Sequence, residues 1–217
     1  RLGKSARPIL LTDGLFAHDG GVAPLKAYLK SLPKRAWLLV DDAHGAGVVG
    51  KTGRGSLEFA GVGRGRIIQT ITLSKAFGVY GGAVLATKAL RETILARSRA
   101  FIGCTPLPLP LANAALQSVK LLRRSKQLRV RLHHNAAWVK AALRRAGFDI
   151  PNLPGPIIAI HPRSDAEVRA LKRRLLAAGI YPPFLKYAGT EKGFLRFVIS
   201  SEHTRGRLRT LIEVLAG

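Results

Sequence analysis

Polar side chains follow short apolar runs at three places in the sequence. Asp41 and His44 belong to DDAHGAG, which follows the run AWLLV. Lys75 belongs to TLSKAFG, which follows the run RIIQTI, and a third such segment, TDGLFAHDGG, follows PILL. Ligands in open α/β sheets bind outside the carboxyl ends of the strands. We therefore expect Asp41, His44 and Lys75 to gather in a single crevice.

These residue types suit the chemistry of a pyridine aldehyde cofactor. A lysine amine can form a Schiff base with an aldehyde when it is partly desolvated or electrostatically tuned. A carboxylate such as that of Asp41 can keep a pyridine nitrogen protonated, which makes the ring an electron sink. His44 can donate a hydrogen bond to a phenolic oxygen, and the hydroxyls of Thr72 and Ser74 beside Lys75 can bind a phosphate. The combination indicates pyridoxal 5'-phosphate.

Each of these signals is weak by itself. A single lysine after a strand is usually a solvated loop residue, and an Asp-Asp pair at a strand end often belongs to a turn or a helix cap. The cluster of Asp41, Asp42 and His44 could bind a metal, but no third and fourth ligand follow at a useful spacing, so no metal site is predicted. The joint occurrence of the segments favours the cofactor.

The elements that carry these segments alternate between strands and helices. Apolar and β-branched runs predict strands over residues 8–12, 36–41, 66–73 and 82–87. Helical spacing predicts helices over 23–31, 88–99 and 109–124. Such alternation predicts an α/β fold with a largely parallel sheet covered on both faces.

The pattern changes in the last part of the chain. A long basic helix is expected over residues 126–147, followed by strands over 157–161 and 194–200 and helices over 165–178 and 202–215. This order indicates a small α+β unit. We place the domain boundary between residues 1–125 and 126–217.

The three polar segments resemble the α-oxoamine synthase family of the class-II aminotransferase group, which has the pyridoxal-phosphate fold type I. The resemblance runs from about Pro8 to the end of the chain and implies a match to the carboxy-terminal part of a family member. Residues 1–125 would then be the carboxy-terminal portion of the cofactor-binding large domain, and residues 126–217 the small domain. Family chains are about twice as long, so we expect this segment alone to bind the cofactor poorly.

The resemblance also implies an activity and site roles. Family members join an amino acid to an acyl thioester, commonly with loss of CO2, as homodimers. Lys75 would form the Schiff base and move the α-proton. Asp41 would pair with the pyridine nitrogen, His44 would contact the phenolic oxygen, and Thr72, with Ser74 beside it, the phosphate. An ordinary aminotransferase or a related lyase on the same scaffold is the alternative.

Three positions depart from the family pattern. Ala17 stands where the family has a serine that contacts the cofactor. Tyr181 replaces an arginine that binds the substrate carboxylate, and Phe184 replaces a threonine. A tyrosine cannot supply the bidentate clamp of an arginine. Either Arg196 or another cation replaces the clamp, or the amino-acid substrate differs.

Composition adds a strong positive charge. Lys and Arg number 36 against 12 Asp and Glu, which gives a formal net charge of +24. Such a charge attracts polyanions. We expect it to draw an acidic acyl carrier protein or the phosphates of an acyl-CoA, whereas a basic nucleic-acid-associated module is the non-enzymatic alternative.

One cysteine fits a cytoplasmic protein, and no apolar run is long enough to span a membrane.

Overall fold

A computed structural model describes residues 7–186 and 193–217 of the chain. Its contacts divide the chain into two compact units, which are described separately. Unit 1 contains residues 1–16 and 22–126, and unit 2 contains residues 17–21 and 127–217. Residues 17–21 thus belong to unit 2, although the sequence places them within the first domain. The roles predicted for the two domains stay predictions.

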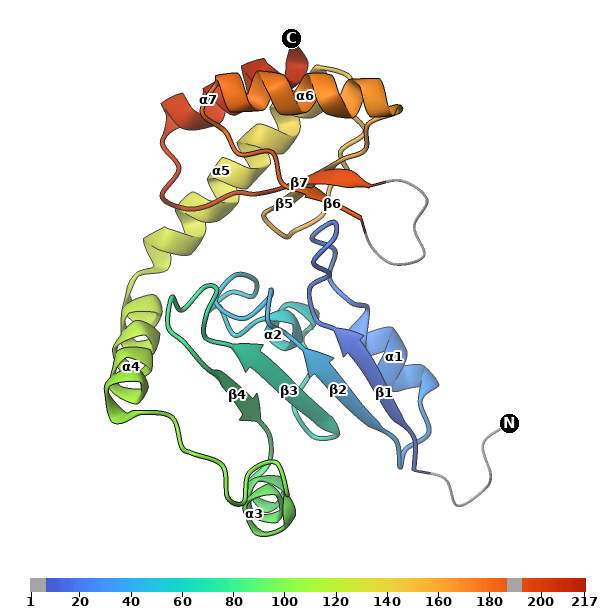
Figure 1. Cartoon of the computed structure of the whole chain (residues 1–217). Helices are drawn as coiled ribbons and strands as arrows, with labels where there is room; N and C mark the ends of the chain where they lie inside the picture. The colour runs from blue at the N-terminus through green and yellow to red at the C-terminus, as the bar shows by residue number, and fades with distance from the viewer. Residues whose placement is uncertain (1–6, 187–192) are drawn as a thin grey trace. The chain divides into compact units, whose positions relative to one another are not determined.

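Unit 1 is built on a sheet with the strand order β1-β2-β3-β4 (Figure 1). The strands are β1 (Ile9–Asp13), β2 (Trp37–Asp41), β3 (Ile67–Thr72) and β4 (Gly82–Leu85). The first three are parallel, and the register pairs Asp13 with Asp41 and Asp41 with Thr70. β4 runs antiparallel to β3 and pairs Gly82 with Thr72. Residues 73–81, which include Lys75, therefore form the connection of a hairpin instead of leading into a crossover helix.

Helices connect the parallel strands, as parallel pairing requires. The helix α1 (Leu25–Ser31) lies between β1 and β2, and α2 (Ser56–Ala60) lies between β2 and β3. Apolar side chains from both helices join Leu38, Val40 and Ile67 in a buried cluster on one face of the sheet. The remaining helices of unit 1 are α3 (Lys88–Arg97) and α4 (Leu109–Arg124). The five-residue helix α2 is not among the elements that the sequence predicts.

The other face of this sheet carries exposed apolar side chains. Ile9 and Leu11 of β1 are 57% and 68% exposed, and Val84 of β4 is 53% exposed. Strand side chains alternate between faces, which places Ile9 and Leu11 opposite to Leu10. The expectation of a sheet covered on both faces is therefore wrong for these positions within the described residues.

Unit 2 packs helices on one face of a three-stranded antiparallel sheet, with the order β5-β7-β6. The strands are β5 (Ile157–Ile160), β6 (Phe184–Leu185) and β7 (Phe194–Val198), and the helices are α5 (Lys126–Arg145), α6 (Asp165–Ala177) and α7 (Arg205–Ala216). Leu195 and Phe197 of β7 face a core that includes Val139, Leu175 and Leu208. The short strand β6 is not among the elements that the sequence predicts.

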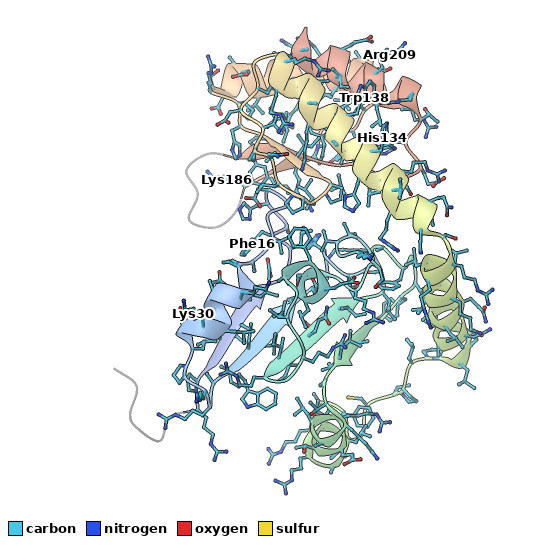
Figure 2. The ribbon with its side chains drawn as sticks, turned by 180° about the vertical axis from the view of Figure 1, so that it is seen from behind. Phe16, Lys30, His134, Trp138, Lys186 and Arg209 are labelled. Carbon is cyan, nitrogen blue, oxygen red and sulfur yellow. The ribbon has the colours of Figure 1, made fainter. Side chains whose placement is uncertain are left out.

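Local sequence explains where two of these helices begin. Ser164 precedes α6 and its hydroxyl accepts a hydrogen bond of 3.2 Å from the Glu167 N–H, while Thr204 caps α7 through the Arg207 N–H. Such caps satisfy backbone donors that the first helical turn leaves without partners. Figure 2 shows His134 and Trp138 on α5, and Arg209 on α7. The Arg205 guanidinium of α7 lies 4.0 Å from the centre of the Trp138 ring and contacts His134.

No helix among the described residues is both long enough and apolar enough to cross a lipid bilayer.

Candidate active site

The carboxyl ends of β2 and β3 bring the predicted site segments of unit 1 to the same edge of the sheet. Asp41 is the last residue of β2 and pairs with Thr70, two residues before the end of β3 at Thr72. Because the two strands are parallel neighbours, the segments that follow them leave the sheet side by side. Asp41, Thr72 and Lys75 therefore lie at one edge of unit 1.

The structure distinguishes Asp41 from Asp42. The Asp41 side chain is exposed, and its Oδ1 accepts a hydrogen bond of 3.0 Å from the Ala43 N–H. Asp42 is completely buried, and its Oδ2 accepts hydrogen bonds from the Ser56 N–H at 2.8 Å and from Gln69 Nε2 at 2.7 Å. Asp41 is thus the carboxylate that a ligand can reach, whereas the Asp42 carboxylate is hydrogen-bonded inside the protein.

The electrostatic setting of Asp42 is unusual for a carboxyl group. Burial raises the pKa of Asp42, and the neighbouring charge of Asp41 acts in the same direction. Hydrogen bonds from Ser56 and Gln69 lower this pKa but do not cancel the effect of burial. The other carboxylate oxygen, Oδ1, is buried without a hydrogen-bond partner in the described part of the chain.

Lys75 stands in a loop that is fixed by its own hydrogen bonds. The Leu73 N–H donates to the Gly81 carbonyl at 2.9 Å, and the Gly78 N–H donates to the Lys75 carbonyl at 3.0 Å. Gly78 has a φ of +63°, which favours glycine over other residues. Ser118 of α4 donates a hydrogen bond of 2.6 Å to the Phe77 carbonyl. The exposed Lys75 side chain therefore projects from a loop whose backbone is held by these hydrogen bonds.

The hydroxyls before Lys75 form a pair. The oxygens Thr72 Oγ1 and Ser74 Oγ lie 2.8 Å apart, and the Ser74 N–H donates to Thr72 Oγ1 at 3.3 Å. Two hydroxyls and a nearby lysine are donors that suit a phosphate.

A close backbone approach joins the loop that carries His44 to the loop that carries Lys75. Gly47 has a φ of +80°, and a Cβ atom at this position would lie 2.6 Å from the Cβ of Ala76. Only glycine permits this approach, since the left-handed conformation and the short distance both disfavour a side chain. His44, three residues before Gly47, is half-buried. The structure thus brings the two segments into contact.

The remaining predicted residues lie in unit 2. The Ala17 carbonyl accepts a hydrogen bond of 2.6 Å from Arg196 Nε, although 179 positions separate them in the sequence. Tyr181 is 80% exposed. The ring of Phe184 lies 4.6 Å from Lys172 Nζ and offers no hydroxyl in place of the family's threonine. Unit 2 therefore carries Ala17 together with Arg196, whereas Lys75 belongs to unit 1.

The donor set of unit 1 fits pyridoxal phosphate. An exposed carboxylate suits a pyridinium nitrogen, the Thr72 and Ser74 hydroxyls suit a phosphate, and an exposed amine at Lys75 suits the aldehyde. Within residues 7–186 and 193–217, no group of three or more His, Cys, Asp or Glu side chains is arranged to hold a metal ion.

Comparisons with known proteins agree with these features. Residues 2–215 match the family model for aminotransferases of class I and II. The chain belongs to this family. The 8-amino-7-oxononanoate synthase of Methylococcus capsulatus is 36% identical over 215 residues, which cover 96% of this chain and 55% of that protein. The enzyme of the same name from Alkaliphilus metalliredigens is 34% identical, over 97% of this chain and 54% of its own length.

Solved structures give the same assignment. The 8-amino-7-oxononanoate synthase of Francisella tularensis superposes with a TM-score of 0.87 at 27% identity, over 98% of this chain and 63% of that protein. A serine palmitoyltransferase variant from S. paucimobilis, solved with a bound PLP–myriocin aldimine, gives a TM-score of 0.89 at 28% identity, over 100% of this chain and 56% of that protein. Both are α-oxoamine synthases, which confirms the resemblance and the predicted α/β fold. The chain spans about half the length of the curated relatives it matches.

Sequence reasoning missed the buried partners of Asp42. Gln69 interrupts the apolar run RIIQTITL, and it is completely buried on the covered face of β3. A polar side chain in a buried strand needs a hydrogen-bond partner. That rule, applied to Gln69, could have indicated a polar network beneath the site, but it could not have identified Asp42 and Arg54 as the residues that Gln69 binds.

Proposed function

We propose that this chain carries the Schiff-base lysine of a pyridoxal-phosphate-dependent acyltransferase that condenses an amino acid with an acyl thioester. The observation that supports this most directly is the convergence of Asp41, the Thr72–Ser74 hydroxyl pair and Lys75 at one edge of the unit 1 sheet. Membership of the class I and II aminotransferase family and similarity to proteins named 8-amino-7-oxononanoate synthase support it further.

The proposed roles follow from the chemistry of each side chain. Asp41 holds the protonated pyridine nitrogen, His44 orients the phenolic oxygen, and Thr72 and Ser74 donate hydrogen bonds to the phosphate. When bound, pyridoxal phosphate supplies an electron sink for the negative charge that develops at the α-carbon of the amino acid. The Lys75 amine holds the cofactor in the resting state and accepts the α-proton of the substrate.

In place of the arginine replaced by Tyr181, another cation would bind the substrate carboxylate, and the candidate that the sequence offers is Arg196. Its Nε donates to the Ala17 carbonyl, and a guanidinium held in this way can still present its terminal amino groups to a carboxylate. Tyr181 and Phe184 do not supply the family's substrate contacts. They therefore favour the alternatives, which are a different amino-acid substrate, a transamination, or a lyase reaction on the same scaffold.

The acyl donor is an acyl-CoA or an acyl carrier protein in this proposal, and the whole protein acts as a homodimer in the cytoplasm. Lys and Arg number 36 against 12 Asp and Glu, so the carboxylates of the chain can neutralise only a minority of the cations. The excess positive charge suits an anionic donor. A non-enzymatic, nucleic-acid-associated role is the alternative that the same charge supports.

Trapping of the cofactor tests the proposal. Borohydride reduction of the chain with pyridoxal phosphate, followed by peptide mapping, should place the pyridoxyl group on Lys75 above all other lysines. Lys75→Ala should lose this label, whereas Lys88→Ala, which changes an exposed lysine of α3, should keep it. The assignment would be contradicted if many lysines were labelled equally, or if the total pyridoxyl label on the chain were the same in Lys75→Ala as in the original chain.

A further inference from the structure

A buried polar network lies directly beneath the exposed carboxylate of Asp41. Asp42 and Gln69 are both completely buried, and Gln69 Nε2 donates to Asp42 Oδ2 at 2.7 Å and to the Arg54 carbonyl at 3.2 Å. Arg64 Nη2 donates to Gln69 Oε1 at 3.1 Å. The network therefore links β3, the segment before β3, and the loop that follows β2.

Asp42 also connects the start of α2 to the end of β2. The Ser56 N–H donates to Asp42 Oδ2 at 2.8 Å, and Ser56 is the first residue of α2. The Gly45 and Ala46 N–H groups donate to the Asp42 backbone carbonyl at 3.1 and 2.9 Å. Through its side chain and its carbonyl, Asp42 thus holds both ends of the segment 43–55.

Glycines surround the Asp42 carboxylate at van der Waals distance. A Cβ atom placed on Gly14, Gly45 or Gly55 would overlap the Asp42 side chain. Gly55 has a φ of +87°, so a larger residue there would be strained even without the overlap. The space between these glycines fits the four heavy atoms of an aspartate side chain closely, so a longer side chain would collide with the surrounding backbone.

We infer that Asp42 is a positioning residue, whose hydrogen bonds fix the backbone of residues 41–47 and thereby aim Asp41 and His44 at the ligand. Asp42 directly follows β2, and its N–H still donates to the Thr70 carbonyl at 2.8 Å, so the alternation of side chains between the two faces continues to it. Asp42 can therefore bind the protein interior only while Asp41 faces outward. The segment it fixes also includes Gly47, which rests against Ala76 beside Lys75. The effect on ligand binding rests on the proposed function, whereas the hydrogen bonds of Asp42 do not depend on it.

The test compares Asp42→Asn with Asp42→Ala. The amide of Asn has the shape of the carboxylate, and its oxygen can accept from the Ser56 N–H and Gln69 Nε2 while its NH₂ group takes the place of Oδ1. Ala removes every side-chain contact. Gln69→Leu, which removes one of the two donors to Oδ2, is the third variant, and Asp149→Ala at an exposed site is the matched control.

Hydrogen exchange of the cofactor-free chain gives the first measurement. In Asp42→Ala the amides of Gly47 and Ser56 should exchange roughly tenfold faster or more, because a buried hydrogen-bond set is lost. Amides of β1 and β2 should keep their protection, and Asp42→Asn should stay within about threefold of the original chain. Unchanged exchange of Gly47 and Ser56 in Asp42→Ala would overturn the inference.

Borohydride trapping on Lys75 gives the second measurement. Asp42→Ala should lose most of the labelling selectivity for Lys75, and Gln69→Leu should lose part of it. Asp42→Asn should lose little, and a general loss of stability would not produce this difference between the Asn and Ala variants. Equal loss in Asp42→Asn and Asp42→Ala would show that charge, and not position, matters, which contradicts the inference. If Asp42→Ala does not fold, the comparison of Gln69→Leu with Asp42→Asn decides. Absence of Lys75 labelling in the original chain even at a large excess of pyridoxal phosphate, which offsets the weak binding expected of this segment, would refute the proposed function. The expected exchange pattern would still support the positioning role.

Discussion

At the residue scale, Lys140 shows how a charge is accommodated inside unit 2. The side chain is 4% exposed, and its Nζ donates to the carbonyl oxygens of Leu153 at 2.8 Å and Gly155 at 2.6 Å. Burial lowers the pKa of Lys140 to about 8; the charge of Arg144 lowers it further and that of Asp19 opposes the change. The Gly155 N–H binds the Gly20 carbonyl at 2.9 Å, so Lys140 helps to hold the segment 17–21.

This pKa predicts a pH dependence of stability. The unfolded chain, with a lysine pKa near 10.5, binds the proton more tightly than the folded chain, with a pKa of about 8. The free energy of unfolding should therefore rise between about pH 8 and 10.5, by at most about 3 kcal/mol, while the full cost of the buried charge is present below pH 8. Urea unfolding of the original chain and of Lys140→Met across this range measures the difference. Lys30→Met, at an exposed position of α1, serves as the control and should retain the slope. Parallel pH profiles of the original chain and Lys140→Met would contradict the prediction.

At the scale of elements, the hairpin from β3 to β4 decides where Lys75 can act. An antiparallel return keeps residues 73–81 at the edge where β2 also ends, whereas a helical crossover would carry the chain away. The contact between Gly47 and Ala76 then ties this hairpin loop to the loop after β2. The site depends on the two loops as a pair.

A glycine substitution tests that pairing. Gly47→Ala should destabilise the chain by about 2 kcal/mol, because an alanine at a φ of +80° is strained and its Cβ would clash with Ala76. It should also reduce borohydride labelling of Lys75. Gly63→Ala is the control, since nothing lies within 4 Å of a Cβ there, and it should be neutral. Thermal unfolding and labelling of both variants provide the measurement; equal stability of the two would contradict this account.

At the scale of the whole molecule, the charge of +24 is the property that no single element explains. The cations extend over several helices, including α6 and α7 of unit 2, where Arg205 rests on Trp138 and Arg209 lies one turn further (Figure 2). Arginine and lysine side chains on helices are often only solvated. The positive charge therefore predicts an anionic partner but does not identify it.

Salt dependence tests the proposed anionic donor. The affinity for an acidic acyl carrier protein should fall severalfold when salt is raised from 50 to 300 mM, because exposed charges are screened over a shorter distance. Binding measured by fluorescence anisotropy at both salt concentrations gives the result. Affinity independent of salt would contradict an electrostatic donor site, and a stronger salt-sensitive shift of DNA would favour the nucleic-acid alternative.

The amino-acid sequence by itself determined the order of the main strands and helices, since apolar runs and helical spacing are local signals. It also identified the strand-end segments with Asp41, His44, Thr72 and Lys75, and with them the family. Only the tertiary structure decided that Asp41 is exposed while Asp42 is buried against Ser56 and Gln69. Likewise it decided that residues 17–21 belong with unit 2. The physical reason is that burial and hydrogen-bond partners arise between segments far apart in the chain, as between Ala17 and Arg196, and no local pattern encodes them.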